Sequence, residues 1–90
     1  MPRYLVERTY PEGFSISNDL EGAQRCQAII ANDAQDQVTW LHSYVTLDKL
    51  RSICVCDAPS PEAVRRAAQR NDLPIDRITE VRVLDPYFYL

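Results

Sequence analysis

The sequence is poor in the residues from which most metal and redox sites are built. It has one histidine, two glycines and three cysteines among 90 residues. Cys54 and Cys56 are spaced as Cys-x-Cys, and with a single histidine they cannot complete a closed structural zinc site. The odd number of cysteines does not fit a disulfide framework and is typical of a reducing compartment. With only Gly13 and Gly22, the chain also lacks a glycine-rich loop for an oxyanion hole.

Basic residues and long apolar runs are scarce as well. Ten lysines and arginines against thirteen acidic residues give a net charge of −3, which is the wrong sign for a nucleic-acid-binding protein. No apolar run approaches the ~20 residues that a membrane span needs, and the N-terminus leads into no signal-type apolar segment. The sequence therefore predicts a small cytoplasmic protein that binds neither nucleic acid nor membranes.

Segments rich in β-branched and aromatic residues predict four strands, over residues 3–10, 38–45, 51–57 and 78–84. Helical patterns lie between the first and second strands and between the third and fourth. The resulting order, βαββαβ, predicts one ferredoxin-like α+β domain over residues 1–90. Such a domain has a four-stranded antiparallel sheet with two helices on one face.

Each predicted helix has a start signal and an apolar face. Ser60 can cap the second helix, Pro61 suits its first position, and Asn71 can end it in a left-handed conformation. The first helix is expected to begin after Asn18, with Glu21 completing a capping box. The expected inward faces are Ala63, Val64, Ala67 and Ala68 on the second helix, and Leu20, Ala23, Cys26 and Ile30 on the first.

Alternation along the strands assigns side chains to the two faces of the sheet. The aliphatic set, which includes Ile53, Val55 and Val81, is expected under the helices. The helix-free face would then carry Tyr4, Val6, Arg8, Trp40, His42, Tyr44, Cys54, Cys56, Glu80 and Arg82. A face with this many aromatic side chains is too apolar to remain in water. We therefore expect a homodimer of the α/β-barrel type, with this face covered by a second subunit, a ligand or both.

Three stretches of the sequence carry a resemblance to a known family. They are Trp40-Leu41-His42-Ser43-Tyr44-Val45, the run Ile53-Cys54-Val55-Cys56-Asp57-Ala58-Pro59-Ser60-Pro61-Glu62-Ala63-Val64, and Ile78-Thr79-Glu80-Val81. Together they resemble a family of small bacterial ferredoxin-like proteins long catalogued as a domain of unknown function. Some members of that family bind nickel. The resemblance covers nearly the whole chain and implies a ferredoxin-like subunit that pairs into a dimer.

The sequence departs from the nickel-binding members at two places. Those members resemble one another in a histidine-bearing first strand and a further histidine in the second helix, whereas residues 4–10 and 65–70 here contain none. Arginine keeps its proton at ordinary pH and cannot replace a histidine ligand. The resemblance thus implies the fold but not the metal. We expect nickel binding to be weak or absent, and any site to depend on His42.

The most specific candidate site is a transition-metal site formed by His42, Cys54 and Cys56. If the hairpin turn centres on Asp48, position 42 lies opposite 54, within ~4.5–5.5 Å between β-carbons. Imidazole and thiolate ligands suit nickel, copper or zinc. The alternatives are ordinary packing of these residues at a dimer interface, and a catalytic pair in which His42 activates a Cys54 thiolate.

A second candidate site is a small-molecule pocket. Aromatic rings beside two arginines suit an aromatic acid or a quinone-like compound. Some proteins of related fold use such a cleft for cofactor-free oxygenation or isomerisation, which is an analogy of fold alone. The residues expected to line it are Tyr4, Arg8, Trp40, Tyr44 and Arg82. The sequence favours a binding protein over an enzyme, and a structural dimer with no ligand remains a third hypothesis.

The C-terminal residues 85–90 hold three aromatic side chains and a leucine. Exposing them to water is unfavourable. We expect this tail either to pack on its own subunit or to cross to a partner.

Overall fold

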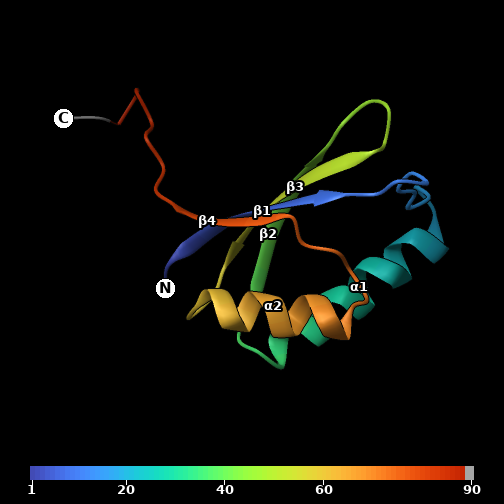
Figure 1. Cartoon of the computed structure of the whole chain (residues 1–90), viewed down its shortest axis with the longest axis horizontal. Helices are drawn as coiled ribbons and strands as arrows, with labels where there is room; N and C mark the ends of the chain where they lie inside the picture. Colours follow the sequence, from blue (N-terminus) through green and yellow to red (C-terminus); the bar gives the residue numbers. More distant parts are fainter. Residues whose placement is uncertain (89–90) are drawn as a thin grey trace.

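Six elements follow one another in the order that the sequence predicts. The computed structural model describes residues 1–88. The elements are β1 (Arg3–Thr9), α1 (Leu20–Ala34), β2 (Thr39–Val45), β3 (Arg51–Asp57), α2 (Pro61–Arg70) and β4 (Arg77–Val81). The strands form one antiparallel sheet in the order β2-β3-β1-β4, and both helices lie on the same side of it (Figure 1). The predicted ferredoxin-like arrangement is confirmed, although β4 ends at Val81 rather than at Leu84.

No helix within residues 1–88 is both long enough and apolar enough to cross a membrane.

Helix α2 starts as predicted and packs through small side chains. Ser60 Oγ accepts a hydrogen bond from the backbone N–H of Ala63 at 3.2 Å, and Pro61 is the first helical residue. The four residues of the predicted face are all buried, and their short side chains bring the helix close to the sheet. Only the end differs from the prediction. Asn71 is right-handed, with φ of −89°, and the left-handed residue is Asp72, with φ of 53°.

Helix α1 starts one residue later than predicted, and its inward face is different. The cap is Asp19, not Asn18: Asp19 Oδ1 accepts a hydrogen bond from the N–H of Gly22 at 3.0 Å. Gly22 is buried against the Ser17 carbonyl, and a Cβ at position 22 would lie 1.6 Å from that oxygen. This close approach helps set the rotation of the helix. The residues on the inward stripe are Gly22, Cys26, Ile29 and Asp33. Leu20, Ala23 and Ile30, which were predicted to face inward, are exposed.

In β1, β3 and β4 the two faces of the sheet are the reverse of those that alternation predicts, whereas His42 and Tyr44 of β2 lie on the helix-free face as predicted. The helix-covered face carries Tyr4, Val6, Arg8, Ser52, Cys54 and Cys56, of which all but Cys54 are buried. The aliphatic residues Leu5, Ile53, Val55 and Val81 occupy the open face and are only half-buried. The prediction was wrong because it assumed that the most aliphatic face must pack on the helices. The helices instead use small side chains, which leave room for larger and more polar groups on the sheet.

A β-bulge in β2 adds a second correction. Trp40 pairs with Cys56, but His42 pairs with Val55, so Leu41 is an extra residue. The bulge separates Trp40, on the helix-covered face, from His42 and Tyr44, on the open face. Strict alternation had placed all three on one face.

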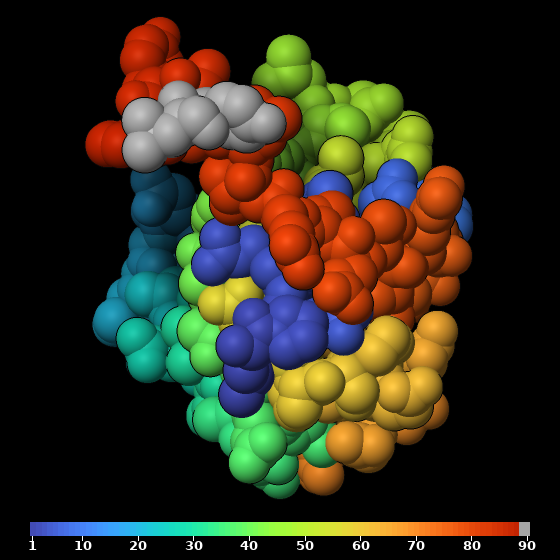
Figure 2. Space-filling model, turned by 90° about the vertical axis from the view of Figure 1, so that its left-hand side faces the viewer, coloured from blue at the N-terminus to red at the C-terminus, as the bar shows by residue number. Residues whose placement is uncertain are grey.

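The tail beyond β4 projects from the body. It leaves the sheet on the side opposite to α2 (Figure 1) and forms a projection in the space-filling view (Figure 2). Tyr87 and Phe88 are 91% and 83% exposed, so they do not pack on their own subunit, which was the first of the two expected placements. The predicted packing of Tyr89 and Leu90 falls outside the described residues.

Candidate functional site

A cavity of about 250 Å³ lies between the helix-covered face of the sheet and the two helices. The segment after β1 contributes Tyr10, Phe14 and Ile16 to its lining. Its walls are mostly apolar, with Val6, Ile29, Val38, Trp40, Val45, Val64, Ala67, Ala68 and Leu73 lining it. A concave, mainly apolar site with a few converging polar groups is the usual form of a small-molecule site.

Arg8, on β1, supplies the cavity with a buried positive charge. The residue is 7% exposed. Its Nη1 donates a hydrogen bond to Cys54 Sγ at 2.9 Å. Its Nε is fully buried and has no hydrogen-bond partner within residues 1–88. A buried guanidinium with unused donors is unfavourable unless another group satisfies it.

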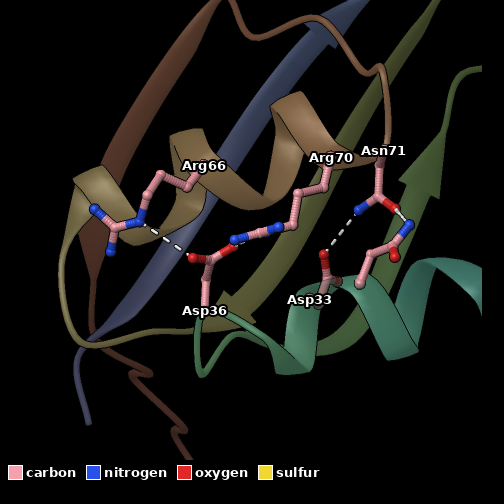
Figure 3. A network of polar contacts seen from close by, with 6 residues as sticks. Asp33, Asp36, Arg66, Arg70 and Asn71 are labelled. Carbon is pink, nitrogen blue, oxygen red and sulfur yellow. Dashed lines mark hydrogen bonds and ion pairs between the residues drawn. The ribbon is translucent and has the colours of Figure 1, made fainter.

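Asp33, at the end of α1, supplies the cavity with an acid. Asn71 Nδ2 donates to Asp33 Oδ1 at 2.9 Å, and Asn32 Nδ2 donates to Asn71 Oδ1 at 2.9 Å (Figure 3). Burial raises the pKa of the Asp33 carboxyl, and the Asn71 hydrogen bond and the charge of Arg8 oppose this only in part. Asp33 is the one acidic residue among those that line the cavity in the described chain.

Asp36 joins the two helices beside the cavity. Its carboxylate lies between two arginines of α2, with Arg70 Nε at 2.8 Å and Arg66 Nε at 3.1 Å (Figure 3). The hydrogen bond from Arg70 and that from Arg66 lower the pKa of Asp36 against the opposing effect of burial. The Asp36 side chain is almost fully buried, at 6% exposure, so these pairs fix the end of α1 against α2.

The predicted metal ligands do not come together within one chain. The observed register places His42 opposite Val55 and Tyr44 opposite Ile53, so the expected pairing of positions 42 and 54 is wrong. His42 lies on the open face, whereas Cys54 and Cys56 point into the helix-covered interior. Burial raises the pKa of Cys56 to about 11, which disfavours the thiolate that a metal needs. Within residues 1–88, no three His, Cys, Asp or Glu side chains are grouped so that they could hold a metal ion.

The same separation applies to the predicted catalytic pair. The sheet lies between His42 and Cys54, so this histidine cannot take a proton from this thiol. Cys54 Sγ instead accepts a hydrogen bond from the Arg8 guanidinium.

The predicted pocket residues are divided between the two sides of the sheet. Arg8 and Trp40 line the cavity. Tyr4 is buried in the adjoining core. Tyr44 lies on the open face, 64% exposed, and Arg82 is exposed beyond the end of β4. Two of the five residues therefore belong to the cavity.

Several cavity residues were missed by reasoning from the sequence, among them Asp33, Ser52 and Asn71. A signal for Asp33 was present. It follows Gly22, Cys26 and Ile29 at helical spacing, so it continues the inward stripe of α1. Placing a carboxylate on that stripe required knowing that Arg8 faces it. Nothing in the local sequence distinguishes Asn71 from an ordinary helix-ending residue.

The open face of the sheet is a second surface of functional interest. Its centre is apolar, with Leu5 and Val55 side by side and His42 and Tyr44 at the β2 edge. Arg3 and Asp57 form an ion pair at 2.9 Å at one end of this face. An apolar centre with a charged border is typical of a protein–protein interface.

Comparison with known proteins gives consistent results. The crystal structure of SCO4226 from Streptomyces coelicolor A3(2) superposes with a TM-score of 0.73, over 92% of this chain and 99% of that one. The two sequences are 22% identical, so this likeness concerns the fold. No curated protein matches the chain significantly. A family model described as nickel responsive protein SCO4226-like matches residues 4–81. Because that match spans the whole folded domain, the chain belongs to the nickel responsive protein SCO4226-like family.

Proposed function

We propose that this protein is a small ligand-binding protein that holds a largely apolar molecule between its sheet and its helices. The observation that carries the proposal is the cavity of about 250 Å³ with a buried arginine in its wall. An apolar cavity of about 150 Å³ is sufficient to bind benzene. This cavity has room for a somewhat larger molecule, such as a substituted ring or a short alkyl chain.

Filling the cavity is expected to abolish binding while leaving the fold intact. Ala68 is 4% exposed and lines the cavity, so the side chain introduced by Ala68→Leu would occupy space that a ligand needs. Filling a void commonly stabilises a protein by ~0.5–2 kcal/mol. Indole is a suitable neutral probe, with binding followed by amide chemical shifts in NMR spectra. We expect shift changes in β1 and α2 for the wild type and none for Ala68→Leu.

Ala28→Leu provides the matched control, because it adds the same side chain on the exposed side of α1. This variant should bind indole like the wild type. Wild-type spectra that do not change around the cavity at saturating indole would contradict the proposed function.

The family name makes a metal the second candidate ligand. The donor groups of one chain do not fit a nickel ion, because His42 is separated from both thiols and no three donors are grouped within residues 1–88. A nickel ion would have to take ligands from a second copy of the chain or from water. The cavity is therefore the better-supported site.

We also propose that the open face of the sheet pairs with a second copy. The apolar centre of this face and the exposed tail residues Val83, Leu84, Tyr87 and Phe88 lie on the side opposite the helices. Both carry apolar side chains that another subunit would cover. The tail, which projects from its own body, is placed to reach a neighbouring molecule.

Tyr44→Glu is expected to weaken this dimer by at least about tenfold, because a carboxylate would be buried in the interface. Tyr44 is 64% exposed in one chain, so the change should leave the monomer folded. Sedimentation equilibrium at micromolar concentration measures the effect. Gln69→Glu, on the exposed side of α2, is a control that adds the same charge elsewhere. A wild-type protein that sediments as a 10.4 kDa monomer would refute the proposed pairing.

A further inference from the structure

The buried charge of Arg8 restricts the chemistry of the ligand. Arg8 is 7% exposed, and no acidic side chain within residues 1–88 lies within ion-pair distance of its guanidinium. Its one hydrogen bond among the described residues is to the Cys54 sulfur, which is a weak acceptor. Arginine carries five N–H donors in a planar fork that matches a carboxylate. The guanidinium is thus buried, charged and largely without acceptors in a cavity that can hold a ligand.

We propose that the ligand of the cavity is a small carboxylic acid, bound as its anion with the carboxylate on Arg8. This inference rests on the proposed function, because it assigns the ligand class of the same cavity. A carboxylate would accept hydrogen bonds from the guanidinium nitrogens that Cys54 leaves free. It would also supply the counter-charge that the surrounding side chains do not provide at close range.

The other polar groups of the cavity limit the ligand to one negative charge. Asp33 faces the same space, and its hydrogen bond comes from Asn71 rather than from Arg8. A ligand with two or more charges would meet repulsion from Asp33 and apolar surface from the remaining walls.

The apolar walls define the rest of the ligand. Trp40, Phe14 and Ile29 lie on three different segments around the cavity and offer surface to a ring or an alkyl chain. The volume of about 250 Å³ exceeds the ~150 Å³ that holds benzene, which leaves space for one ring with a short acidic arm. An unbranched alkanoate of similar size has the same chemistry. The test therefore compares an aromatic acid with an unbranched alkanoate.

The test compares acids with their neutral amides by titration calorimetry at neutral pH. The first pair is 3-phenylpropanoate and 3-phenylpropanamide, and the second is octanoate and octanamide. We expect the wild type to bind at least one acid about tenfold or more tightly than its amide. The pair with the larger difference indicates whether a ring or an alkyl chain is preferred.

Two substitutions at Arg8 test whether the preference for the acid over its amide depends on this side chain. Arg8→Gln should bring the acid and the amide to within about twofold of each other, whereas Arg8→Lys should keep part of the preference because it keeps the charge. Arg82→Gln removes one positive charge from an exposed position and should behave like the wild type.

Equal binding of acid and amide by the wild type would overturn the carboxylate assignment but leave the cavity as a ligand site. If acids, amides and indole all fail to bind the wild type, the proposed function itself fails.

Discussion

Gly22→Ala is expected to lower the melting temperature of this protein by about 10 °C or more, although alanine is the better helix former. The new Cβ would lie 1.6 Å from the Ser17 carbonyl oxygen and 2.7 Å from its carbon. Both atoms belong to the backbone, so no side-chain rotation relieves the overlap. The segment before α1 would have to move, and the hydrogen bond from Gly22 N–H to Asp19 would be lost with it.

The magnitudes decide the sign of this effect. Alanine gains about 1 kcal/mol over glycine in a helix. Overpacking costs ~1–3 kcal/mol or more, and loss of an N-cap costs about 1 kcal/mol. Because both overlapping atoms belong to the backbone, we take the upper part of the overpacking range, about 2–3 kcal/mol. The loss of the cap and the gain from alanine cancel, so the net loss is also about 2–3 kcal/mol, and each kcal/mol lowers the melting temperature of a domain of this size by ~4–8 °C.

Thermal unfolding followed by circular dichroism measures this loss, with Glu21→Ala as a control on the neighbouring exposed residue. A melting temperature for Gly22→Ala at or above that of the wild type would show that the Ser17 carbonyl can move freely.

Asp33→Asn and Asp36→Asn are expected to change stability in opposite directions at neutral pH. Burial raises the pKa of Asp33. The free energy of unfolding therefore falls as pH rises from the unfolded pKa of about 3.9 through the folded pKa, and the cost persists above it. Replacement by neutral asparagine removes this cost and should stabilise the protein at pH 7.

Asp36 has the opposite sign, because Arg70 and Arg66 lower its pKa. Its contribution is fully present above the unfolded pKa of about 3.9 and is lost as pH falls through the folded pKa. Asp36→Asn should therefore destabilise the protein at pH 7 and have less effect in acid.

Urea unfolding at pH 7 and at about pH 3 measures both effects, since the two pH values lie on either side of the ordinary carboxyl pKa. Each aspartate serves as the control for the other, because they are close in sequence and differ in their partners (Figure 3). If Asp33→Asn instead loses stability at pH 7 and loses less at pH 3, the attraction of Asp33 to Arg8 outweighs the cost of its burial.

Much of the fold could be predicted from local features. The strands, the Ser60 cap and the small-residue face of α2 depend on the properties of neighbouring residues, and each of these predictions is confirmed. The cap of α1 was misplaced because Asn18 and Asp19 are both good caps. The choice between them depends on the contact of Gly22 with the Ser17 carbonyl, which only the folded chain shows.

The site could be predicted only in part, because it depends on which face of the sheet the helices cover. Arg8 and Trp40 were recognised as pocket residues from their chemistry, and both line the cavity. The metal hypothesis required His42 and Cys54 to share a face, which depends on the register between two strands. Hydrophobicity alone pointed to the wrong face, because the inner face carries a charged arginine and small thiols.

The bulge at Leu41 also affects how relatives of this protein should be compared. If a strand of the same length paired regularly, with Trp40 still opposite Cys56, position 42 would lie opposite Cys54, and its imidazole would turn inward toward the thiols, on the same face as Trp40. A homologue with an identical histidine but no bulge would therefore place that histidine on the helix-covered face of the sheet. Residues aligned in β2 are equivalent in space only when both strands carry the bulge.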